Sequence, residues 1–355
     1  MAVGCNVSQR SVAISAYRAR KRNLPRLPQD INDFVIENEW AETLDGQDFL
    51  LFDDRLENGR IVCFCAQADL RMMCRIDELY LDGTFSCAPR LFSQLYTIHG
   101  FFEEKQLPLC YVLLTGKTTE MYEHLFRRLK EHAAQLQLVL NPTRIVSDFE
   151  IGVKRAVAIQ FPQAEHKGCF FHFCQAVYRK VQELGLQGQY NNPEQPETRN
   201  FVRKLMASGF LPQAEVIPAV QALAGEAPDV PRMNEFINYF QDTWIGGRFP
   251  IRMWNVHQQR RRTNNDVEGW HNAFNRLVRK FHPNIWELIV ALRKEQANAA
   301  ATQLQIFAGH IIGVRQVRYV RLNERLQTFT QQYIDGVILR DRFLSCVAYA
   351  LAAPL

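Results

Sequence analysis

The chain has 355 residues, of which 47% are hydrophobic and 22% are charged, and its formal net charge is +5 at pH 7. These values exclude an intrinsically disordered chain, and the length is more than one small hydrophobic core requires. The longest apolar tract, residues 343–355, is too short to span a bilayer, so we expect no membrane partner. The nine cysteines are scattered along the chain, which favours a reducing compartment.

Basic residues are concentrated in two segments. Residues 1–26 contain six Arg or Lys and no acidic residue, and residues 251–280 contain seven basic and two acidic residues. Such segments predict a polyanionic partner, although two solvated basic surfaces would give the same composition. The run "RARKR" at 18–22 is typical of a nuclear localisation signal and favours the nucleus; an unstructured, solvated arm is the alternative.

The first predicted elements are a hairpin, a helix and a strand. Residues 49–54 and 59–66 predict the hairpin, and the helical spacing of apolar residues in 67–78 predicts the helix. The strand is "DELYLDGTF" at 77–85, in which the apolar residues Leu79, Leu81 and Phe85 are expected to face the core. Asp82 lies in the middle of this strand, where burial of a carboxylate costs several kcal/mol unless a cation or a donor offsets it.

The elements that follow predict a fold of the α/β class. Residues 91–102 and 107–116 predict a second antiparallel hairpin, and 118–136 predict a helix capped by Thr118 or Thr119. Strand and helix then alternate: strand 143–148, helix 149–161, strand 166–172 and helix 173–184. Three meandering antiparallel strands followed by βα units make a mixed sheet with helices on its faces.

The composition changes at the Gly-, Pro- and Asn-rich stretch 185–197, beyond which residues 198–245 show only helical patterns. Two later helical patterns, at about 264–281 and 284–306, are expected to return to the sheet. The predicted division is a basic N-terminal arm (1–45), the first part of the α/β core (46–185), an all-α insertion (186–262), return helices of the core (263–310) and a C-terminal helical segment (311–355).

Two further acidic residues match Asp82. Asp148 follows Ile145 and Val146 at the carboxyl end of a predicted strand, the edge at which α/β sheets bind ligands. Capping of the following helix is the structural alternative for Asp148. Glu268 begins a predicted helix, in which it shares a face with His271 and Asn275 while Trp270, Phe274 and Leu277 lie on another. An acid in a first turn also suits the helix dipole.

Three blocks around these acids carry a resemblance: "YLDGTF", "IVSDFEIG" followed by "GCFFHF", and "TNNDVEGWHNAFN". Together they resemble the catalytic blocks of the Mutator-like element (MULE) transposases, which belong to the DDE superfamily. The blocks occur in the family's order, and the resemblance covers about residues 70–285, with a long helical insert before the Glu block. It implies a ribonuclease H-like fold, a mixed sheet with flanking helices interrupted by an all-α insertion.

The resemblance also implies a chemistry. Asp82, Asp148 and Glu268 would be the catalytic residues and would bind two Mg²⁺ or Mn²⁺ ions, which promote cleavage of DNA at transposon ends and strand transfer to target DNA. A rigid strand would then explain the burial of Asp82, and Gly83 would leave room for a phosphate. The implied partner is DNA, as transposon ends and as target, and relatives commonly act as homodimers.

Cys169 and His172, spaced as C-x-x-H, form another signature of the family. A zinc site needs two more ligands, for which the nearby Cys174 and His166 are poorly spaced. We therefore expect a supporting role, in which the pair braces the core near Asp148, and we keep zinc binding as the alternative.

Arg260, Arg261 and Arg262 precede the helix that bears Glu268. We expect these arginines to lie along the catalytic edge and to bind DNA phosphates, contacts that give salt-dependent affinity without sequence preference. His271 is expected to support the site by orienting a phosphate, with packing in the core as the alternative.

Relatives often carry a zinc-binding recognition module before or a Cys/His-rich module after the catalytic domain, and residues 1–355 show neither spacing. An active DDE transposase is favoured by the three acids. A host-adopted, catalytically inactive DNA-binding protein derived from a transposase is favoured by the absent module. An exonuclease on the same fold is disfavoured, because the helical insert and the Glu block are not typical of one.

Overall fold

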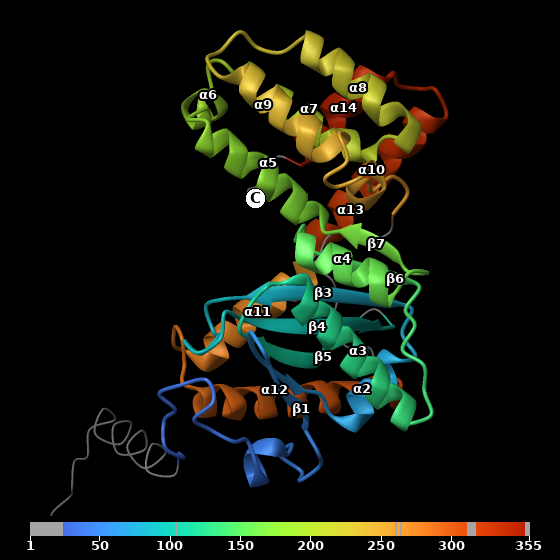
Figure 1. The fold of residues 1–355 in the computed structure, drawn as a ribbon. Helices are drawn as coiled ribbons and strands as arrows, with labels where there is room; N and C mark the ends of the chain where they lie inside the picture. The colour runs from blue at the N-terminus through green and yellow to red at the C-terminus, as the bar shows by residue number, and fades with distance from the viewer. Residues whose placement is uncertain (1–23, 104, 260, 263–264, 311–316, 352–355) are drawn as a thin grey trace, which may run out of the picture.

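The structure, a computed structural model, describes residues 24–103, 105–259, 261–262, 265–310 and 317–351. A seven-stranded sheet with its helices occupies one part of the molecule, and a group of helices occupies the other (Figure 1). The strands are β1 (Leu50–Leu56), β2 (Gly59–Phe64), β3 (Glu78–Thr84), β4 (Gln94–Phe102), β5 (Lys105–Leu114), β6 (Arg144–Ser147) and β7 (Glu165–Gly168).

The sheet is mixed, in the spatial order β1-β2-β5-β4-β3-β6-β7. All pairs from β1 to β3 are antiparallel, whereas β3 pairs with β6 and β6 with β7 in parallel. Both predicted hairpins are present, as β1–β2 and β4–β5. The α/β class and the order of strands and helices predicted from the sequence up to β7 are thus confirmed.

Helices cover both faces of this sheet. Along β2, Ile61 and Cys63 pack in the core with α2 (Gln67–Met73), α3 (Thr119–Gln135) and α4 (Ile151–Gln160). The alternate residues, Val62 and Phe64, pack instead with α11 (Asn265–Val278) and α12 (Ile285–Phe307). The period-two alternation of side chains along a strand therefore places one apolar set in each layer. The two helices predicted to return to the sheet do so as α11 and α12.

The remaining helices share a separate hydrophobic core. Trp254 and Phe173 lie at its centre, where their stacked rings are 4.8 Å apart and both side chains are fully buried. Leu326 and Phe343, from the last two helices, pack into the same core. The helices are α5 (Phe170–Glu183), α6 (Gln187–Asn191), α7 (Glu197–Ala207), α8 (Gln213–Gly225), α9 (Met233–Phe240), α10 (Ile251–Trp254), α13 (Val317–Ile334) and α14 (Arg340–Ala350), with a 3₁₀ turn at Ser208–Phe210 and a π turn at Gln241–Ile245.

Two details of the strands differ from the sequence prediction. The strand predicted at 166–172 ends at Gly168, and α5 begins at Phe170, so the segment up to His172 is helical. The reason is that Phe170 and Phe173, at helical spacing, are buried in the helical core rather than in the sheet. Phe85 follows the last residue of β3 and is 51% exposed, with the Lys117 ammonium 4.3 Å from its ring centre.

The described part of the predicted N-terminal arm packs on the sheet layer. Phe34 and Trp40, the latter in a 3₁₀ turn at Asn38–Ala41, lie 6.1 and 5.0 Å from the ring of Trp286 in α12. The arm was predicted from charge, whereas these residues bury apolar rings, which stabilises the packing of α12. The run 18–22 lies outside the described residues.

Among the helices that the structure describes, none combines the length and apolarity needed to cross a membrane.

A buried acid joins α2 to α12. Asp69 is 1% exposed and accepts hydrogen bonds from Gln303 (2.9 Å) and Gln296 (3.3 Å). Burial raises the pKa of Asp69 from 3.8 to about 6, although the two amide donors oppose the shift. The folded state therefore holds its proton to higher pH than the unfolded chain does, and the free energy of unfolding falls as the pH rises from about 4 to about 6.

We predict that Asp69→Asn raises the free energy of unfolding by about 1–3 kcal/mol above pH 6 and leaves it nearly unchanged near pH 4, because the amide cannot ionise. Urea unfolding across this pH range measures the effect. Asp229→Asn, at an exposed position, is the control and should show no pH-dependent gain. An equal gain of Asp69→Asn at both pH values would contradict the burial explanation.

Candidate active site

Asp82 and Asp148 lie side by side because β3 and β6 are parallel neighbours. The register pairs Glu78 with Arg144 and Tyr80 with Val146, an offset of 144 − 78 = 66 positions. The two acids are separated by the same offset, 148 − 82 = 66, and each lies two residues beyond the last pair, Tyr80 and Val146. Side chains at matching positions of adjacent parallel strands point to the same face. Both carboxylates therefore occupy one face at the carboxyl ends of β3 and β6.

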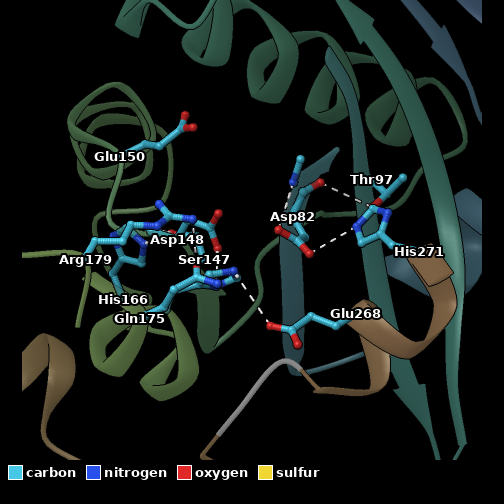
Figure 2. A network of polar contacts seen from close by, with 12 residues as sticks. Asp82, Thr97, Ser147, Asp148, Glu150, His166, Gln175, Arg179, Glu268 and His271 are labelled. Carbon is cyan, nitrogen blue, oxygen red and sulfur yellow. Dashed lines mark hydrogen bonds and ion pairs between the residues drawn. The ribbon is translucent and has the colours of Figure 1, made fainter. Parts of the chain in front are cut away.

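Glu268 reaches this edge from α11. Figure 2 shows Glu268 and His271 on the same side of α11, facing β3 and Asp82. The predicted shared face is extended by Asn275, whose Oδ1 accepts a hydrogen bond from Ser86 at 3.0 Å. On the predicted apolar face, Phe274 is buried but Leu277 is 38% exposed, because it lies near the end of the helix, beyond the sheet contact.

His172 lies between the acids. Its Nδ1 is 2.7 Å from Asp148 Oδ1, and its Nε2 is 3.7 Å from Glu268 Oε1. Ligand atoms of Asp82, Asp148 and His172 all lie within 4.8 Å of one another, and so do those of Cys169, His172 and Glu268. The structure thus gathers the three predicted acids around one imidazole. Glu268 is grouped with His172 and Cys169 and not with both aspartates.

The electrostatics of the site follow from burial. Burial raises the pKa of Asp148 and raises that of Glu268 to about 7, and the charge of Asp82 adds to both shifts. Burial alone would lower the pKa of His172, but its contacts with Asp148 and Cys169 raise it to about 11. At neutral pH the His172 ring is therefore a cation that offsets the cost of placing carboxylates close together.

Asp82 is fixed by groups from three elements. It is 5% exposed; its Oδ1 accepts a hydrogen bond from the Gly83 N–H at 3.0 Å, and its Oδ2 lies 3.0 Å from His271 Nε2. Behind it, Thr97 on β4 donates from Oγ1 to the Asp82 carbonyl at 3.3 Å (Figure 2). His99 Nε2 is 2.9 Å from that hydroxyl. His271 thus contacts the carboxylate of Asp82 directly.

Thr97 and His99 were not predicted as part of the site. Thr97 pairs directly with Asp82 across the antiparallel β3–β4 ladder. Both side chains are completely buried, and burial lowers the pKa of His99 well below its ordinary value. The available signal was two polar residues at alternate positions in the otherwise apolar run "LYTIHGFF".

The expectation that Gly83 leaves room for a phosphate is wrong. A Cβ at Gly83 would clash with the amide oxygen of Gln94 and lie 3.3 Å from the ring of Tyr96. Gln94 is fully buried and donates from Nε2 to the Tyr122 hydroxyl at 2.7 Å. The missing side chain is therefore needed for packing inside the protein, where protein atoms already fill the space.

The zinc ligands considered from the sequence are not assembled with the C-x-x-H pair. His166 instead lies 2.8 Å from Ser147 Oγ, and Cys174 is buried in the helical core. In the described residues, the metal-ligand groups that contain Cys169 or His172 include neither of these two side chains. The additional ligand brought close to the pair is Glu268.

The predicted DNA-binding arginines make contacts within the protein. The Arg261 guanidinium carbon lies 3.7 Å from the ring centre of Phe101. Arg262 donates to Asn323 Oδ1 in α13, lies 5.0 Å from the ring centre of Phe210, and has a pKa lowered to about 10 by burial. Arg260 lies outside the described residues. A role of these arginines in DNA binding stays a prediction.

The site has donor atoms that suit a divalent cation. Asp148 Oδ1 and Glu268 Oε1 are buried oxygens that lack a hydrogen bond of good geometry from any described residue, although both lie near the His172 ring. Carboxylate oxygens are the hard ligands that Mg²⁺ and Mn²⁺ prefer. Asp82 and Asp148 therefore fit a bound divalent ion with the imidazole of His172 beside them, and Glu268 lies on the other side of the same ring.

We predict that His172→Gln lowers the free energy of unfolding by about 2 kcal/mol in EDTA near pH 6, because the acids lose the cation that lies between them. The folded-state pKa of His172 is raised, so its stabilisation is complete below about pH 6.5 and is lost as the pH rises towards about 11. Chemical denaturation measures the change. His310→Gln, an exposed position, should be neutral. Equal stability of His172→Gln and the parent protein would mean that the ring does not offset the acids.

No curated protein matches this chain. Residues 78–176 match the family model of the MULE transposase domain. The matched segment begins with β3 and ends within α5, so it includes Asp82, Asp148 and His172 and ends before Glu268. Residues 78–176 are thus similar to the MULE transposase domain, the family that the sequence motifs resemble.

Proposed function

We propose that this protein is a MULE-type DDE transposase that cleaves DNA phosphodiesters and transfers the strand in a divalent-metal-dependent reaction. The observation that carries the proposal is the convergence of Asp82, Asp148 and Glu268 on one edge of the sheet, from segments far apart in the sequence. The match of residues 78–176 covers the two aspartates, and α11 brings the third acid to them.

The topology supports a ribonuclease H-like core. Three antiparallel strands in the order β5-β4-β3 are followed by β6 and β7, both parallel to β3, which corresponds to the arrangement that the resemblance implies. The hairpin β1–β2 extends the β5 edge. Between β7 and α11 the chain forms helices, as expected for an all-α insertion between the second aspartate and the glutamate.

In the proposed reaction, Mg²⁺ or Mn²⁺ ions would supply charge stabilisation for the attacking and leaving oxygens of the phosphodiester. Asp82, Asp148 and Glu268 would hold them. His271 and the Gly83 N–H keep the Asp82 carboxylate in one orientation, since they contact different oxygens of it. Thr97 holds the backbone of Asp82 from the neighbouring strand. These contacts hold the Asp82 carboxylate in place before a metal binds, as the partners of metal ligands commonly do.

The partner in this proposal is DNA, as transposon ends and as target. The two basic segments, 1–26 and 251–280, would provide salt-dependent contacts to phosphates. Action as a homodimer and a location in the nucleus belong to the same proposal, the latter supported by the basic run at 18–22.

We predict that Asp82→Asn, Asp148→Asn and Glu268→Gln each reduce Mn²⁺-dependent nicking of labelled DNA by at least ~1000-fold, because each removes a charged ligand. Binding to the same DNA, measured by anisotropy, should be retained. Asp266→Asn is the matched control, since Asp266 is an exposed acid in the same first turn as Glu268. The control variant should nick DNA at the parent rate.

Two results would count against the proposal. Nicking that survives Glu268→Gln would place the metal site elsewhere. DNA binding without nicking by the parent protein in Mg²⁺ and in Mn²⁺ would favour the alternative, a host-adopted, catalytically inactive DNA-binding protein.

A further inference from the structure

Cys169, His172 and Glu268 form a second group of metal-ligating side chains beside the aspartates. Their donor atoms, one from each residue, all lie within 4.8 Å of one another. Cys169 is completely buried, whereas 20% of the His172 side chain and 27% of the Glu268 side chain are exposed. A cation can therefore reach the group from the Glu268 side while the thiol closes its inner end.

The backbone holds this group together independently of any ion. Cys169 is the N-cap residue of α5, and its N–H donates to the Ser147 carbonyl at the end of β6 at 2.9 Å. The next N–H, of Phe170, donates to the Arg262 carbonyl at 3.1 Å, in the segment that leads to α11. The starts of α5 and α11 are thus tied to each other, and His172 and Glu268 project from their first turns.

The donor types select a different metal from that of the acid site. A thiolate and a neutral imidazole are borderline-soft ligands that favour Zn²⁺, whereas carboxylates alone suit Mg²⁺ and Mn²⁺. Zinc binding would therefore release to solvent the proton that His172 carries in the metal-free protein and the proton of the Cys169 thiol. Ligands at the usual Zn–S and Zn–N distances, in a tetrahedron, lie about 3.3–3.8 Å apart. The donor atoms lie no more than 4.8 Å apart, so side-chain shifts of about 1 Å bring them to these distances.

We propose that Cys169, His172 and Glu268 bind Zn²⁺ with one open coordination position, and that this site excludes the catalytic cation by taking Glu268. Because Glu268 and His172 also border the acid site, the two metals compete for the same carboxylate. The zinc-binding part stands on these three side chains alone, whereas the inhibitory part rests on the proposed function. Zinc would then inhibit the enzyme.

Zinc binding is tested with Co²⁺ as a spectroscopic probe on the full chain in the absence of Mg²⁺. We expect one equivalent of Co²⁺ to give a tetrahedral visible spectrum and a thiolate-to-cobalt charge-transfer band, both abolished by one equivalent of Zn²⁺. The charge-transfer band should disappear in Cys169→Ala and persist in Cys346→Ser, a half-buried thiol in α14. A melting curve in EDTA checks that Cys169→Ala is folded. Glu268→Gln is a second variant, changed at a partly exposed residue, and we expect it to bind Co²⁺ at least ~10-fold more weakly. A parent protein without a thiolate band, or a band unchanged in Cys169→Ala, would overturn the site.

Competition is measured without activity, by the electron paramagnetic resonance of Mn²⁺ bound to the protein. One equivalent of Zn²⁺ should release Mn²⁺ from the parent protein, and Cys169→Ala should need at least ~10-fold more zinc for the same release. Equal zinc requirements would mean that competition occurs at the carboxylates without the thiol, against the proposal. Absence of nicking together with a cobalt–thiolate band would reject the catalytic function and leave the zinc site standing.

Discussion

The parallel register between β3 and β6 is the constraint on which the site depends. It places Asp82 and Asp148 at matching positions of neighbouring strands. A slip of one residue would turn one of the two carboxylates to the opposite face of the sheet. Two carboxylates about 5 Å apart at an effective dielectric constant near 20 repel each other by roughly 3 kcal/mol, so the apolar core beneath the strands has to offset this cost. That core includes Leu79, Leu81 and Ile145.

His172 connects this cost to the helical part of the molecule. It lies in the first turn of α5, the helix whose other face packs into the helical core through Phe173 and Val177. The same ring contacts Asp148 and Glu268. Packing of the helices therefore fixes the position of a cation between the acids. The all-helical part of the molecule thus contributes to the site, because its packing positions α5 and His172.

The extent of the match to the MULE transposase domain has a structural meaning. The matched residues contain both aspartates and the start of α5. The third acid comes from α11, which packs on the face of the sheet opposite to α3 and α4. Completion of the site hence depends on the Phe170–Arg262 hydrogen bond and on the packing of Phe274 and Ile285 on the sheet, contacts that join residues from distant segments.

The sequence by itself determined the α/β class, the two hairpins, the order of strands and helices up to β7 and the helical character of α11 and α12, because apolar periodicity and local motifs encode these features. The role of the three acids stays a prediction. It could not place His172 between Asp148 and Glu268, bring Thr97 behind Asp82, or fill the space at Gly83 with Gln94. The prediction of a strand up to His172 was wrong because Phe170 and Phe173 are buried among helices from distant segments, which favours a helix there. These features depend on contacts between residues far apart in the chain, which only the tertiary structure decided.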